Sequence, residues 1–228
     1  MKSEFYAQIH LHTAESSACG RATARELIRA CKKAGYSLVV VTDHFMNANI
    51  NCDPNASWED KIQCLMRGYR LAKDEGDKLG ITVLFGWETE NNGPEILTYG
   101  LDEQYLRAHP DVADWDEERY IRETRAAGAL LIHAHPFREA SYITPFVPKP
   151  ELYDGFEVYN ARQSAHPEWN CKALKMAEKN NLIQTAGSDA HSVIEVSSAA
   201  MILPWPVTDM PGFIAAIRSG KCKFVEEL

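Results

Sequence analysis

The sequence has no long hydrophobic run and no paired cysteine motif, and each absence argues against a class of protein. No apolar stretch approaches the roughly 18 residues that a membrane-spanning helix needs. The start, MKSEFYAQIH, lacks the apolar segment of a signal peptide. The six cysteines form no C-x-x-C pair, and six in 228 residues do not suggest a disulfide framework. We therefore expect a cytoplasmic protein with reduced thiols and no membrane partner.

Basic charge is also scarce, because 24 Lys and Arg residues face 32 Asp and Glu residues, a formal net charge of -8. Proteins that bind nucleic acid neutralise phosphates with clustered basic side chains, so this composition argues against a nucleic-acid partner. Neither a G-x-G-x-x-G nor a G-x-x-x-x-G-K-[ST] loop is present. The sequence has no internal repeat and no recognisable linker, so we expect residues 1–228 to form one domain.

Short apolar runs alternate along the chain with longer amphipathic stretches. The seven runs expected to be strands are FYAQIH, SLVVVT, ITVLFG, ALLIHA, GFEVYN, NLIQTAG and AAMILP. Runs that are almost continuously apolar fit strands buried on both faces, as in a parallel sheet covered by helices. The pattern predicts an α/β fold built of βα units, a small, incomplete barrel of about seven strands, with an open doubly wound sheet as the alternative.

The intervening stretches carry helix signals. Thr23 with Glu26 fits a capping box, and Gly35 and Gly80 stand where helices end. Two segments, 45–57 and 137–154, are expected to be long loops that follow strands, where the active sites of barrels form.

Side chains that can bind metal ions gather at the ends of the predicted strands. The six sets, in chain order, are His10 and His12; Asp43 and His44; Glu88; His133 and His135; Glu157 and Asn160; Asp189 and His191. In a parallel barrel these ends meet at one rim, so we expect the side chains to converge. A buried ring of imidazoles and carboxylates without a cation would carry a large desolvation cost, which favours a metal centre.

The donor types narrow the choice of ion. Imidazoles mixed with carboxylates suit zinc, manganese or iron, whereas calcium and magnesium prefer oxygen ligands. The donors exceed one tetrahedral site, so two or three ions with Glu88 as a bridge are expected. Clustered divalent ions suit phosphate-ester hydrolysis, because they activate water and hold the phosphate oxygens.

The ordered motifs HLHT, VVVTDH, GWE, AHPFR and GSDAH resemble those of the PHP (polymerase and histidinol phosphatase) family, and YDGFEVYN resembles its G-x-E-x-x-N strand. The resemblance implies a distorted (β/α)7 TIM-like barrel with a two- or three-metal site. It places His10, His12, Glu88 and Asp189 on one ion, His135 with Glu88 on a second, and His44 with His191 on a third. Glu15 or Cys19 stands where the family often has Asp or His. Glu90 or Glu95 stands where members with three ions have a further His, and His133 is an additional candidate.

The motifs indicate a metal-dependent phosphoesterase that hydrolyses a small phosphate ester by a metal-activated water. We expect Asp43 to orient a ligand or act as general base, and Arg138 to clamp phosphate, with Arg162 a second candidate. One alternative is a metal-dependent amidohydrolase, although no Lys stands at the strand ends to bridge ions. The other is a non-catalytic PHP module that binds a partner protein.

Overall fold

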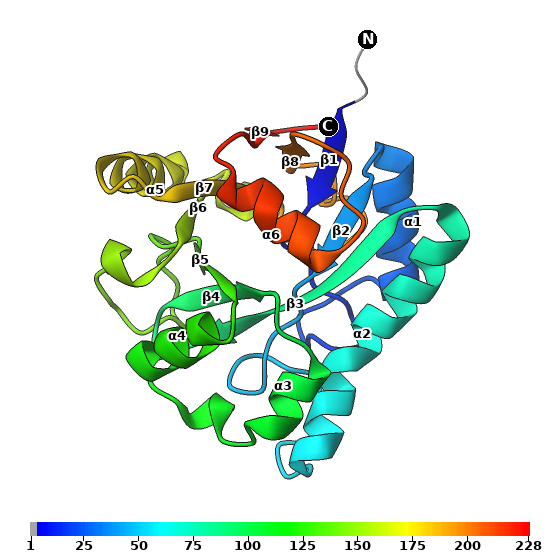
Figure 1. Ribbon diagram of the computed structural model, residues 1–228, viewed down its shortest axis with the longest axis vertical. Coiled ribbons are helices and arrows are strands. Elements are labelled where there is room, and N and C mark those ends of the chain that lie inside the picture. The colour runs from blue at the N-terminus through cyan, green and yellow to red at the C-terminus, as the bar shows by residue number, and fades with distance from the viewer. Residues whose placement is uncertain (1–3) are drawn as a thin grey trace.

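The computed structural model describes residues 4–228, and its centre is a strongly curved nine-stranded sheet surrounded by helices (Figure 1). The strand order is β7-β6-β5-β4-β3-β2-β1-β8-β9. The strands are β1 Phe5–Gln8, β2 Leu38–Val41, β3 Thr82–Glu90, β4 Glu95–Tyr99, β5 Leu130–Ala134, β6 Gly155–Asn160, β7 Ile183–Gly187, β8 Ala200–Leu203 and β9 Lys223–Val225. The helices are α1 Ala24–Ala34, α2 Trp58–Leu79, α3 Glu103–Ala108, α4 Glu117–Ala126, α5 Pro167–Lys179 and α6 Met210–Arg218.

The sheet forms a nearly closed barrel, which confirms the predicted fold class. Its two ends approach each other where the Ala186 N–H of β7 faces Met201 Sδ of β8 at 3.2 Å. Inward-facing residues of the strands pack against Phe213 and Ile217 of α6. Helix α6 lies across one end of the barrel (Figure 1), so the hydrophobic core fills this end and leaves the other for polar side chains.

Two strands were not predicted, and the sheet is not wholly parallel. Strand β4 pairs antiparallel with both β3 and β5, and β8 pairs antiparallel with β1 and β9. The chain enters β4 through a tight turn in which Asn92 and Gly93 both have positive φ, so no crossover helix separates β3 from β4. Since β4 runs against both neighbours, β3 and β5 still point the same way and still end at one edge.

The predicted helix boundaries are confirmed where the sequence carried capping signals. The Thr23 side chain accepts a hydrogen bond from Glu26 N–H, and the Glu26 side chain accepts one from Thr23 N–H, which completes the capping box of α1. Gly35 and Gly80 end α1 and α2 in the left-handed conformation, with φ of 96° and 63°. Strand β1 is shorter than predicted and ends at Gln8. Among the described residues, no helix combines the length and apolar character needed to cross a membrane.

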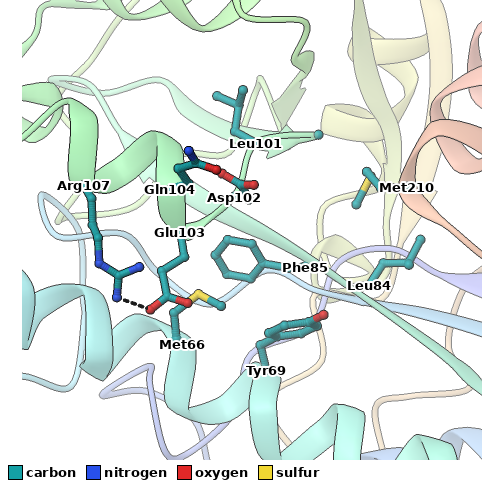
Figure 2. A pocket seen from close by; sticks show the side chains of 11 residues that line it. Met66, Tyr69, Leu84, Phe85, Leu101, Asp102, Glu103, Gln104, Arg107 and Met210 are labelled. Atoms are coloured by element: carbon teal, nitrogen blue, oxygen red, sulfur yellow. Dashed lines mark hydrogen bonds and ion pairs between the residues drawn. The ribbon is translucent and has the colours of Figure 1, made fainter.

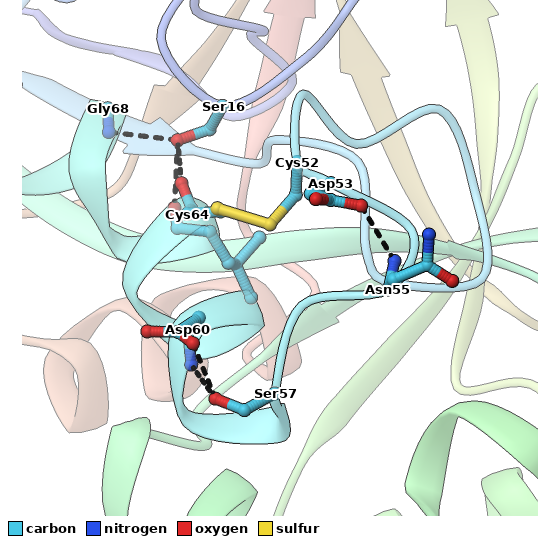
Figure 3. Close-up of a disulfide and its surroundings, with 9 residues drawn as sticks. Ser16, Cys52, Asp53, Asn55, Ser57, Asp60, Cys64 and Gly68 are labelled. Atoms are coloured by element: carbon cyan, nitrogen blue, oxygen red, sulfur yellow. Dashed lines mark hydrogen bonds between the residues drawn. A yellow bond between two sulfur atoms is a disulfide. The ribbon is translucent and has the colours of Figure 1, made fainter.

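The expectation that all cysteines are reduced is wrong at one pair. A disulfide joins Cys52 in the loop after β2 to Cys64 on α2, with their Cα atoms 5.8 Å apart (Figure 3). The sequence gives no sign of this pair, because the two cysteines are 12 residues apart and meet only when the loop folds back onto the helix. The bond fastens loop 45–57 beside the polar end of the barrel.

Candidate metal centre

Most of the predicted side chains converge at the polar end of the barrel, which we call the C-terminal rim because strands β1, β2, β3, β5, β6 and β7 end there. All of them are at least nine-tenths buried, and an additional carboxylate, Glu95, enters from the start of β4. The members of this cluster are His10, His12, His44, Glu88, Glu95, His135, Asp189 and His191.

Glu88 lies at the centre of the cluster. Its Oε1 lies 3.1 Å from His135 Nε2 and 3.2 Å from His10 Nε2. Its Oε2 lies 3.2 Å from His44 Nδ1 and 3.4 Å from His12 Nε2. A carboxylate with two imidazoles at each oxygen has the arrangement that a bridge between two ions requires.

Asp189 closes the cluster from β7. Its Oδ1 lies 3.3 Å from His12 Nε2 and 3.6 Å from His10 Nε2. Asp189 has a φ of 51° and His135 a φ of 29°, which are uncommon for residues with a side chain. Backbone strain of this kind concentrates at functional sites, where a side chain must be aimed in one direction.

The donors fit divalent metal ions. Four groups of three place their donor atoms within 4.8 Å of one another. They are His12, His44 and His191; His10, His12 and Asp189; His10, Glu88 and His135; and His44, Glu88 and Glu95. His44 Nδ1 and Glu95 Oε2 are buried without a hydrogen-bond partner, which is costly for polar atoms that nothing else satisfies.

The charges of the cluster are unevenly balanced. Burial works against a charged His10, but the carboxylates of Glu157, Asp189 and Glu88 raise its pKa well above the usual value. Burial lowers the pKa of His44 to about 4, so this ring is neutral at pH 7 and its lone pair is available. Burial and nearby Glu88 raise the pKa of Glu95 to about 7. The positive charges of the protein therefore do not fully balance the negative charges of the carboxylates in the cluster.

Groups behind the cluster fix the orientation of the rings. His10 Nδ1 donates to Glu157 Oε1 at 2.8 Å, and Asn160 Nδ2 donates to the other carboxylate oxygen at 2.8 Å. Glu157 therefore supports His10 from behind and does not enter the cluster. Gly187 permits this packing, since a Cβ there would lie 2.6 Å from His10 Cβ and would overlap Glu157 Oε1. Such supports set which ring nitrogen is free to bind a metal.

Asp43 lies beneath the cluster, where its carboxylate is fully engaged. Its oxygens accept from Thr13 N–H at 2.6 Å, Thr13 Oγ1 at 2.8 Å and Ser17 Oγ at 2.7 Å. Ser17 Oγ also accepts from His44 N–H at 3.0 Å and lies 3.4 Å from His12 Nδ1. Asp43 thus acts on the histidines through Ser17, a residue whose importance the sequence did not indicate.

Gly68 of α2 packs directly against this support, which gives a testable prediction. A Cβ there would overlap Thr13 Oγ1 and lie 2.6 Å from Asp43 Oδ2. Gly68→Ala gains about 1 kcal/mol of helix propensity but overpacks a buried polar contact, at a cost of about 1–3 kcal/mol. We expect a net loss of about 1 kcal/mol in urea unfolding and weaker metal binding. Gly80→Ala, at an open helix end, should leave metal binding unchanged, and equal metal affinity in Gly68→Ala would contradict the role of this contact.

The cluster opens into a cleft of about 620 Å³ that two arginines border. Arg138 Nη2 donates to Asp189 Oδ2 at 2.7 Å and to Asn160 Oδ1 at 3.1 Å. Arg162 reaches Asp189 only at 3.8 Å and pairs with Glu195 at 3.1 Å. Tyr142, from the predicted loop 137–154, also lines the cleft and is 64% exposed.

Four candidates remain. Glu90 lines the cleft but belongs to none of the four donor groups, and the other three take different positions. Glu15 faces away from the cluster and accepts from Ala24 N–H at the start of α1. His133 lies on the outer face of β5, where its ring packs among those of Phe146, Tyr153 and Phe156. Cys19 lines the cleft, with Sγ 3.1 Å from His191 Nε2.

A second hollow of about 560 Å³ lies on the side of the barrel, between α2, α3 and α6 (Figure 2). Phe85 and Met210 line it, and its Arg107 is paired with Glu103 at 2.6 Å. No histidine lines this hollow, so it lacks the donor set of the rim.

Comparisons with known proteins agree with this architecture. Residues 167–222, which include Asp189 and His191, match a family model described as PHP-associated. No curated protein matches the sequence. A two-domain protein from Bacteroides vulgatus, described as containing a predicted PHP-like metal-dependent phosphoesterase, has a TM-score of 0.71 at 16% identity. The match covers 99% of this chain and 65% of that one, so this chain spans only part of the two-domain protein.

Two further structures share the fold. PsfC from Pseudomonas syringae has a TM-score of 0.69 at 18% identity, covering 98% of this chain and 91% of PsfC. A lesion-specific endonuclease from Pyrococcus furiosus has a TM-score of 0.62 at 13% identity, covering 97% of this chain and 58% of the endonuclease. The resemblance to the PHP family is therefore confirmed by the matched segment and by the fold. The expectation against a nucleic-acid partner stays a prediction.

Proposed function

We propose that this chain is a metal-dependent phosphoesterase that hydrolyses a small phosphate ester. The observation that carries the proposal is Glu88, whose two oxygens each lie within 3.4 Å of two imidazole nitrogens at the head of an open cleft. Divalent ions bound there would lower the pKa of a bound water and neutralise phosphate charge.

The proposed ligands divide among two or three zinc, manganese or iron ions. They are His10, His12, Glu88 and Asp189 for the first ion; Glu88 and His135 for the second; and His44 and His191 for the third. Glu95 supplements the group around Glu88, because its unpartnered Oε2 lies 3.5 Å from His135 Nδ1. Mixed nitrogen and oxygen donors of this kind suit these three metals.

Arg138 has the position of a phosphate clamp in this proposal. Its side chain is 13% exposed, lines the cleft and is held beside Asp189, so it can present its remaining N–H groups to phosphate oxygens. Asp43 has a positioning role, because Thr13 and Ser17 already occupy the carboxylate that a general base would need free.

Arg138→Lys is expected to lower kcat/KM about 10- to 100-fold, because the variant keeps the charge and loses the planar fork. The proportion of bound metal should stay close to that of the wild type, which elemental analysis checks alongside the kinetics. Arg162→Lys, at the longer distance from Asp189, should have a smaller effect. An Arg138→Lys enzyme with wild-type kinetics would remove the clamp from the proposal.

Two further expectations belong to the same proposal. Residues 1–228 form one domain, since a single barrel contains every element described. A cytoplasmic location is the second expectation; the free thiols of Cys19, Cys31, Cys171 and Cys222 favour it, and the Cys52–Cys64 disulfide does not.

The test is release of phosphate, or cleavage, from a panel of phosphomonoesters, phosphodiesters, amides and short oligonucleotides, with manganese, zinc and iron added separately. We expect hydrolysis of a small phosphate ester, lost in His12→Ala and kept in His166→Ala, which removes an exposed histidine outside the cluster. Cleavage of amides alone would favour the amidohydrolase alternative, and cleavage of oligonucleotides alone a nuclease. If no substrate is hydrolysed, or if His12→Ala hydrolyses it as fast as the wild type, the cluster is not the source of the activity. The alternative of a non-catalytic module would then remain.

A further inference from the structure

Cys19 lies beside the cluster in a position that the proposed ligand sets do not use. It belongs to the turn between β1 and α1, is half-buried, and lines the cleft together with His44 and His191. Its Sγ lies 3.1 Å from His191 Nε2. This thiol therefore lies within hydrogen-bond distance of a metal-capable ring nitrogen.

The backbone holds the thiol in this position. Ala18 N–H donates to Asn49 O at 2.9 Å, and Arg21 N–H donates to His191 O at 2.8 Å, so both sides of Cys19 are fastened. Gly20 allows the tight turn, because a Cβ there would lie 2.5 Å from the carbonyl carbon of Thr13. The turn thus sets Cys19 against His191 independently of the thiol itself.

His191 presents the nitrogen that a metal would need. Its Nδ1 donates to the carbonyl of Asp189 at 2.8 Å, so the proton is on Nδ1 and the lone pair of Nε2 faces Cys19. This is the arrangement of a metal-binding histidine whose other nitrogen is held by a backbone carbonyl.

His44 is a second, independent sign of a ligand at this place. It is 8% exposed, and its Nδ1 has no hydrogen-bond partner although it lies 3.2 Å from Glu88 Oε2. His44, His191 and His12 place donor atoms within 4.8 Å of one another. Since His12 also faces Asp189 and Glu88, the group around His44 and His191 lacks a donor of its own.

We propose that Cys19 supplies this donor, as a thiolate that completes a third metal site with His44 and His191. When an ion binds, the S–H bond breaks, its proton leaves to solvent, and the sulfur lone pair forms the bond to the metal. A site of two imidazoles and one thiolate prefers zinc or cobalt over manganese, because sulfur is a soft donor. Three protein ligands leave a fourth position open toward the cleft.

This inference rests on the proposed function only in requiring that the cluster binds metal. The probe is cobalt(II) added to the metal-free protein without reductant, so that Cys52 and Cys64 stay in their disulfide. We expect a near-ultraviolet sulfur-to-cobalt charge-transfer band in the wild type. Cys19→Ser should lose the band and about one cobalt per chain, whereas Cys171→Ser, which removes an exposed thiol of α5, should keep both.

Two further measurements guard against a variant that fails to fold. Cys19→His should bind as much cobalt as the wild type without the sulfur band. In the wild type, zinc should protect Cys19 but not Cys171 from alkylation, which peptide mass spectrometry resolves without any substitution. Absence of the band, or a band that survives in Cys19→Ser, would overturn the inference. If the protein hydrolyses phosphate esters but shows no band, only the thiolate ligand is contradicted. If it shows the band but hydrolyses none of the esters, only the proposed function is contradicted.

Discussion

Glu88→Gln is expected to abolish hydrolysis and to remove most of the bound metal. The substitution keeps the shape of the side chain but removes its negative charge and exchanges one oxygen for an amide nitrogen, which cannot bind an ion, at the point where four imidazoles meet. Removing a residue that only supports a metal ligand costs about 10- to 100-fold, so the loss of a shared ligand should exceed 100-fold in kcat/KM.

Metal content and activity are measured together on Glu88→Gln purified and reloaded beside the wild type. Glu90→Gln is the matched control for metal content, because Glu90 lies two residues along the same strand and belongs to none of the four donor groups. A Glu88→Gln protein that keeps its full complement of metal would show that the carboxylate is not a bridge, and the ligand assignment would have to be redrawn.

The metal-binding side chains of the rim could be predicted from the sequence because a single rule of parallel sheets determines where they lie. The carboxyl ends of parallel strands meet at one edge, so His10, His44, Glu88, His135 and Asp189 are brought together by the order of the strands alone. No long-range contact had to be guessed, and the cluster follows once the fold class is right.

The roles of individual side chains in the cluster depend on local features of the structure that this rule does not predict. Glu95 enters the cluster because β4 starts at the rim, and the hairpin that puts it there was not predicted. Glu157 was expected at a strand end, but it is the third of the six residues of β6, and an irregularity between Glu157 and Tyr159 in the pairing of β6 with β7 accompanies its position behind His10. Ser17 carries no signal in the sequence, because a serine in a turn is ordinary until its partners are known.

His133 was a candidate ligand because it stands two residues before His135, and alternation along a strand would put both on one face. The strand ends at Ala134, however, and the left-handed backbone at His135 turns that ring into the cluster. His133 remains on the outer face with neither nitrogen hydrogen-bonded. Burial lowers its pKa to about 3.

This buried ring predicts a specific loss of stability in acid. The unfolded chain binds a proton at His133 near pH 6.5 and the folded chain only near pH 3, so stability falls as the pH drops through this window. At about pH 4.5 the loss attributable to His133 is about 3 kcal/mol relative to neutral pH. His133→Phe keeps an aromatic ring among Phe146, Tyr153 and Phe156 and removes the group that takes up the proton. Its free energy of unfolding should therefore fall by about 3 kcal/mol less than that of the wild type between neutral pH and about pH 4.5.

Urea unfolding with a chelator present, at neutral pH and at about pH 4.5, measures the difference without a metal contribution. His133→Leu should show the same reduced acid sensitivity at lower overall stability, because it removes the titration and also the ring stacking. If His133→Phe and the wild type lose the same stability between the two pH values, the imidazole is protonated in the folded state. It would then have a partner in the folded protein, and the dry aromatic surroundings described for His133 would be wrong.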